Sequence, residues 1–127
     1  MGSQQILLIA LGIILVALTI FAGYGIAKDY LENTNREQLI STIYDIGLLA
    51  QQYSKKDVKA GGGGGTFNGW IIPAQLRSTE SGTFNAFVSQ DKVNLTAVGK
   101  EIGMNGITNV RVNAIVDVNE IKIIVVN

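Results

Sequence analysis

The chain begins with a long run of apolar positions that contains no charged side chain. Residues 6–27 are mostly Ile, Leu, Val and Ala, and Gly12, Thr19 and the 23–25 triplet are the only interruptions. As an α-helix this run would be about 33 Å long, enough to cross a membrane hydrocarbon core of about 30 Å. The pattern therefore predicts that residues 1–27 form a membrane-spanning helical segment. A cleavable secretory signal is less well supported, because the basic n-region is missing and the run exceeds the usual h-region.

Charged residues begin at Lys28, yet the helical pattern continues without a proline or a turn cluster through residues 28–54. Five apolar or aromatic residues recur there at steps of three and four, which places them along one face of a helix: Leu39, Ile43, Ile46, Ala50 and Tyr53. This amphipathic half predicts a stripe that packs against the remainder of the chain. A continuous helix to Tyr53 would be about 80 Å long, more than a domain of this size can cover.

The junction of the two halves carries Gly23, Tyr24 and Gly25. Each glycine costs a helix interior about 1 kcal/mol relative to alanine, so this region could be a place where the helix loosens. Close helix packing, or a membrane interface with Tyr24 in the headgroup region, explains the same residues equally well. Both interpretations stay open on the sequence alone.

A glycine-rich stretch over residues 57–70 follows, with five consecutive glycines at 61–65. A phosphate-binding loop would need a preceding strand and a Gly-Lys-Ser/Thr sequence after the glycines, and neither is present. The stretch is therefore interpreted as a flexible surface connection. Trp70 to Pro73 would then return the chain to an apolar core.

From Gly82 onward the pattern changes to short runs rich in Val, Ile, Thr and Phe, separated by turn residues. We predict four strands at 83–89, 92–98, 110–116 and 120–126, the last two as an antiparallel hairpin. A sheet over residues 82–127 and the amphipathic helix would each bury the apolar face of the other. The expected fold is α+β: a long N-terminal helix packed on a four-stranded antiparallel sheet, with residues 28–127 as a globular head.

Composition removes several function classes. Ten basic and ten acidic residues balance, so no net field favours nucleic acid or another charged partner, and the 127 residues include no cysteine or histidine. Asp45, Asp91 and Glu101 are carboxylates without a visible partner, while Asp117 and Glu120 are interpreted as turn residues rather than calcium ligands. We expect no enzyme activity, no cofactor and no metal.

A long helix that is apolar in its first half and amphipathic in its second, followed by a loop and an antiparallel sheet, resembles the type IV pilins and the pseudopilins of type II secretion. The resemblance covers the whole architecture and is specific in about the first fifty residues. In that family a prepilin peptidase cleaves after a glycine, the new N-terminus is methylated, and a glutamate usually occupies the fifth mature position. The resemblance implies the peptidase and the pilus assembly machinery as partners.

If Met1 is the mature N-terminus, the glutamate position falls on Gln5; cleavage after Gly2 would instead place Leu7 there. Gln5 can accept a hydrogen bond but cannot neutralise the terminal amine of a neighbouring subunit, so the chain departs from the family at this point. The residues at 23–25 correspond loosely to the part of the pilin helix that melts during assembly.

The expected function is a structural subunit of an extracellular filament, a fimbrium, polymerised with identical copies through its apolar helix after an inner-membrane stage. Two alternatives stay open: a pseudopilin or minor pilin of a secretion system, and a membrane-anchored periplasmic binding module without a polymer.

Overall fold

The computed structural model describes residues 2–127, and Met1 lies outside them. The elements are the helix α1 (Gly2–Lys55), a 3₁₀ turn at Val58–Ala60, the short helix α2 (Ala74–Arg77), and the strands β1 (Ser78–Thr79), β2 (Gly82–Val88), β3 (Val93–Ile102), β4 (Asn109–Val116) and β5 (Ile121–Val125). The chain divides into two compact units, of which unit 1 ends at Leu31 and unit 2 is Glu32–Asn127. The boundary lies within α1, four residues beyond the end of the predicted membrane segment.

Unit 1 consists of the first part of α1 alone. Its Leu, Ile and Ala residues are apolar and no proline interrupts them, so every backbone N–H beyond the first turn can bond within the helix. The hydroxyl of Thr19 also bonds internally, because its Oγ1 donates to the Leu15 carbonyl at 2.8 Å. The Thr19 hydroxyl and the helical backbone beyond the first turn therefore have hydrogen-bond partners without water.

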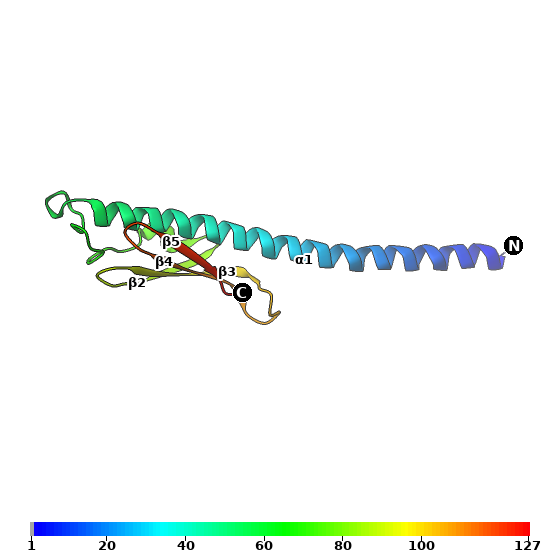
Figure 1. The fold of residues 1–127 in the computed structure, drawn as a ribbon. Coiled ribbons are helices and arrows are strands. Elements are labelled where there is room, and N and C mark those ends of the chain that lie inside the picture. The colour runs from blue at the N-terminus through cyan, green and yellow to red at the C-terminus, as the bar shows by residue number, and fades with distance from the viewer. Residues whose placement is uncertain (1) are drawn as a thin grey trace. The chain divides into compact units, whose positions relative to one another are not determined.

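Unit 2 is a two-layer structure in which the second part of α1 lies along one face of the sheet (Figure 1). The five strands follow one another in sequence order, and every neighbouring pair is antiparallel. In β3 and β4 the buried positions alternate with more exposed ones, as the two-residue period of a strand requires. The predicted hairpin is confirmed, with Val112 opposite Val125 and Val116 opposite Ile121.

The core of unit 2 lies between α1 and the sheet. It contains fifteen buried apolar residues, which are Leu39, Ile43, Ile46, Ala50, Phe67, Trp70, Ile72, Phe84, Val93, Leu95, Ala97, Val110, Val112, Ala114 and Val116. Gly47 lets the helix approach the last hairpin closely, since a Cβ there would lie 3.1 Å from both Ile121 Cδ1 and Val116 Cγ2. The expected α+β architecture, a long apolar N-terminal helix packed on an antiparallel sheet, is present.

The predicted number of strands is wrong, because the sheet has five strands rather than four. The additional strand β1 has two residues and pairs Ser78 with Thr83 and Thr79 with Gly82. A strand this short shows no alternation in the sequence and owes its conformation to pairing with β2. Strand β3 also runs four residues beyond its predicted end, through an irregularity in register between Val98 and Ile102.

The glycine run has a defined conformation rather than that of the expected flexible connection. The backbone N–H groups of Gly63, Gly64 and Gly65 donate to the carbonyls of Tyr53, Lys56 and Ser54, respectively, at 2.6–2.9 Å. The Tyr53 and Ser54 carbonyls belong to the last turn of α1, where a helix leaves carbonyls without internal partners, and Lys56 directly follows the helix. A Cβ on Gly63 would overlap the Thr66 carbonyl oxygen. The run is therefore a C-terminal cap of α1, and at Gly63 this cap leaves no room for a side chain.

Candidate membrane and assembly surface

The surface of unit 1 is dominated by the apolar segment, residues 6–27. Every large apolar side chain from Ile6 to Ile26 is exposed, and the exposed fraction reaches 82% at Phe21. This helix is long and apolar enough to cross a membrane, and none of its most apolar window is buried. A single helix has no second element to pack on, so in water this surface would stay uncovered.

A concave notch interrupts the surface of the apolar segment at Gly12. The notch is lined by Ile9, Gly12, Ile13, Val16, Ala17 and Ile20. A Cβ on Gly12 would meet no described atom within 4 Å, so no contact within the described part of the chain requires a glycine there. The missing side chain leaves a place where an apolar group from another molecule could approach the helix backbone.

The predicted processing and loosening residues also lie in unit 1, apart from Met1, which lies outside the described residues. Gln5 is exposed within the first turns of α1. The helix continues without a break through Gly23, Tyr24 and Gly25, and Tyr24 is 71% exposed. A Cβ on either glycine would meet no atom within 4 Å. Helix loosening at 23–25 therefore stays a prediction, and no contact among residues 2–127 explains the glycines.

The predicted helix-head residues all lie together in unit 2. Leu39, Ile43, Ile46 and Ala50 have no exposed surface. Tyr53 is partly buried against the same core, and its hydroxyl donates to the Asn68 carbonyl at 2.6 Å. This stripe holds the outer half of α1 on the sheet, and the tyrosine ties the helix end to the glycine-rich segment.

Sequence reasoning missed the polar member of that stripe. Asn35 lies four residues before Leu39, faces the sheet and is 6% exposed. Its Nδ2 donates to the Ser81 carbonyl at 2.7 Å, and its Oδ1 accepts from the backbone N–H groups of Lys100 and Glu101 at 3.1 and 3.4 Å. Its position in register with the apolar stripe was the available signal. Asn35 joins α1 to the β1–β2 turn and to the irregular part of β3.

The structure brings three of the carboxylates to one depression and leaves Asp45 outside it. Asp91, Asp117 and Glu120 line one open depression together with Gly65, yet residues 2–127 contain no group of three side chains placed to hold a metal ion. Asp45 is exposed on α1 and does not line that depression. Within the same residues the single ion pair is Arg36 with Glu32, at 2.6 Å.

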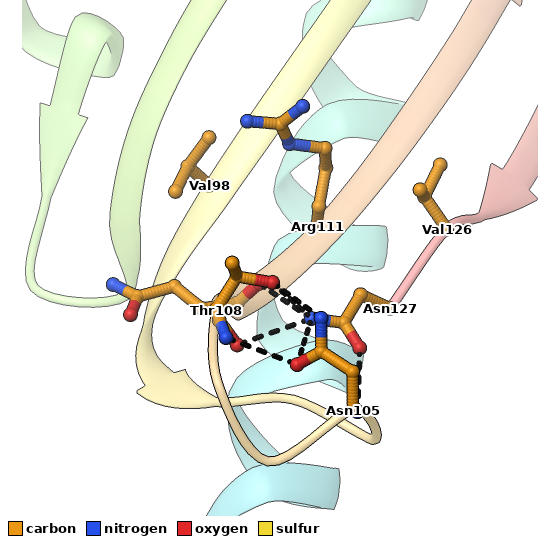
Figure 2. A pocket seen from close by; sticks show the side chains of 7 residues that line it. Val98, Asn105, Thr108, Arg111, Val126 and Asn127 are labelled. Carbon is orange, nitrogen blue, oxygen red and sulfur yellow. Dashed lines mark hydrogen bonds between the residues drawn. The ribbon is translucent and has the colours of Figure 1, made fainter.

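The loop between β3 and β4 is held by a network of amide hydrogen bonds (Figure 2). The Asn127 side chain, 8% exposed overall, donates from Nδ2 to the carbonyls of Thr108 and Asn109 at 3.1 and 3.0 Å. Its Oδ1 accepts from the Asn105 N–H at 3.0 Å. A Cβ on Gly103 would come within 2.5 Å of this amide, so the glycine leaves the space that Asn127 occupies.

Comparison of the chain with protein-family models, with curated proteins and with solved structures gave no match.

Proposed function

We propose that this chain is a structural subunit of a type IV pilus-like helical filament. The apolar segment 6–27 holds it in the inner membrane before assembly and packs against the same segment of other copies afterwards. The observation that carries the proposal is the uninterrupted exposure of the large apolar side chains from Ile6 to Ile26. The chain is a building unit rather than an enzyme, and its final location is an extracellular filament on the cell surface.

Energetics support a change of surroundings for this segment. Full burial of one Leu, Ile or Phe side chain contributes about 1.5–3 kcal/mol, and the segment contains many such residues. Lipid chains can cover them, and so can helices of the same kind. Filament assembly then exchanges one apolar environment for another, so its specificity depends on packing between side chains and on features such as the notch at Gly12.

The independence of unit 2 is a second support. Its core is built from residues between Leu39 and Val116, and no residue of 6–27 belongs to it. Unit 2 needs nothing from the apolar segment to bury its own apolar faces. The segment is therefore free to be covered by lipid or by neighbouring subunits, as a subunit with two successive environments requires.

Electron microscopy of surface filaments from the native cells, with mass spectrometry of the purified fibres, tests the proposal. We expect uniform thin fibres composed of this chain, with the N-terminal peptide showing whether Met1 is methylated. The same spectra distinguish the Met1 register from cleavage after Gly2. A short periplasmic assembly instead of surface fibres would indicate the pseudopilin or minor-pilin alternative. A chain that remains a monomer in detergent and forms no fibre in cells would be a membrane-anchored module.

A substitution in the notch separates membrane insertion from assembly. Gly12→Leu keeps the segment apolar, so the amount of chain in the membrane fraction should not change, whereas filling the notch should reduce the yield of filaments. Ala22→Leu, outside the notch, is the matched control, and its filament yield should be closer to that of the original chain.

A further inference from the structure

Two large apolar side chains stand exposed at the tip of the β3–β4 loop. Met104 is 66% exposed and Ile107 is 81% exposed, which makes Ile107 the most exposed large apolar residue of unit 2. Both belong to a run, 102–110, that contains no charged residue. Apolar side chains on a neutral tip are a common feature of protein surfaces that contact another apolar phase.

The loop holds these side chains in a defined arrangement. Besides the Asn127 contacts, Asn105 Oδ1 accepts from the N–H groups of Ile107 and Thr108 at 2.9 and 3.0 Å. The Gly103 N–H donates to the Thr108 carbonyl at 2.8 Å, and Gly106 adopts φ +70°, a conformation that favours glycine. These bonds hold the tip in one conformation before it meets a partner, which lowers the entropic cost of binding.

The tip lies at the end of unit 2 where α1 enters it. Asn35, which is near the first residue of unit 2, bonds to the backbone of Lys100 and Glu101. From these two residues β3 runs directly into the loop. Figure 1 shows this loop at the same end of unit 2. In the sequence only residues 28–31 separate the start of unit 2 from Ala27, the last residue of the predicted membrane segment.

We propose that the β3–β4 tip inserts Met104 and Ile107 into the headgroup region of the same membrane that holds residues 6–27. This inference rests on the membrane-held stage of the proposed function. The short distance along the chain between segment and unit 2 selects lipid as the partner, because a membrane around 6–27 would bring its surface to this end of the unit. Lys100 and Arg111 are both exposed and lie on either side of the uncharged run, with the partly buried Glu101 between Lys100 and the run. The two basic side chains can reach lipid phosphates while their stems follow the apolar boundary.

The absence of cysteine from the chain makes a site-specific test possible. The full chain with Ile107→Cys carries an environment-sensitive fluorophore and is reconstituted into vesicles of phosphatidylethanolamine and phosphatidylglycerol. Lipids with a nitroxide near the headgroup are then added as quenchers. Phe87→Cys is the matched control, since Phe87 is 72% exposed but lies next to the C-terminal end of β2, at the opposite end of the sheet. Ile14→Cys, measured with lipids that carry the nitroxide deep on the acyl chain, reports insertion of the apolar segment, because residue 14 lies near the middle of 6–27 and out of reach of a headgroup quencher.

We expect the probe at 107 to emit at shorter wavelength than the probe at 87 and to lose more of its intensity to the shallow nitroxide. Adding Met104→Ser to the Ile107→Cys chain should reduce this quenching. Equal and weak quenching at 107 and 87, with a quenched probe at 14, would overturn this inference and leave the proposed function intact. An unquenched probe at 14 would remove the membrane stage, and the proposed function with it. Quenching between labelled copies that persists without nitroxide lipids would mean that a second chain, and not lipid, covers the tip.

Discussion

Gly99 of β3 leaves the space that the side-chain amide of Asn35 on α1 occupies. A Cβ on Gly99 would overlap Asn35 Oδ1 and would lie 3.1 Å from Leu39 Cδ1. The pair sits where the ladder between β3 and β4 is irregular, so the N–H groups of Lys100 and Glu101 are free to bond to the helix. A missing side chain on the sheet and a buried amide on the helix thus form one complementary contact.

Asn35→Ala should destabilise unit 2 by about 2–3 kcal/mol, because it leaves the Lys100 and Glu101 N–H groups and the Ser81 carbonyl without their partner. Urea unfolding followed by the fluorescence of Trp70, the single tryptophan of the chain, measures the change. Glu37→Ala, at an exposed position two residues along the same helix, is the control and should change the free energy of unfolding by less than about 0.5 kcal/mol. Equal effects of the two substitutions would contradict the role given to Asn35.

Gly99→Ala should cost about 1–3 kcal/mol in the free energy of unfolding, since the added methyl group overlaps the Asn35 amide. In the double variant Asn35→Ala with Gly99→Ala the overlap is gone. The double variant should therefore lose less free energy of unfolding than the sum of the two single losses, with a coupling of about 1 kcal/mol or more. The double-mutant cycle is measured by the same Trp70 unfolding, and strict additivity would show that the two residues do not act through one contact.

Gly63→Ala should be more damaging than Gly65→Ala, although both lie in the glycine run. At Gly63 the added Cβ overlaps the Thr66 carbonyl, so the cap of α1 must open, at a cost of about 2 kcal/mol or more. At Gly65 the φ of +96° is strained for alanine but the space is open, and about 1 kcal/mol is expected. Thermal unfolding in detergent compares them. A merely flexible connection would tolerate both substitutions without loss.

A chain reduced to residues 32–127 should be a soluble folded monomer, because the fifteen core residues all belong to unit 2. Sedimentation velocity and circular dichroism without detergent provide the measurement. The full chain, under the same conditions, should aggregate or form fibres through its exposed apolar segment. Precipitation of the shortened chain would show that unit 2 exposes apolar surface that the longer chain normally covers.

The sequence alone was sufficient for features with a strong period or composition. The uncharged run 6–27, the helical stripe from Leu39 to Ala50 and the final hairpin all appear in the order and type expected. Burial on one face imposes a regular pattern on the stripe and the hairpin, and the run 6–27 stands out by its uniformly apolar composition. The filament function stays a proposal that depends on the character of the apolar run and on a resemblance in architecture.

Tertiary structure alone decided the features that arise from contacts between distant segments. β1 has two residues and no period of its own; it exists because β2 is beside it. The glycine run looked flexible in the sequence, yet the free carbonyls at the end of α1 give its N–H groups partners. Asn35 and Gly99 are 64 residues apart in the sequence. Only the folded structure brings the Asn35 amide into the space that Gly99 leaves.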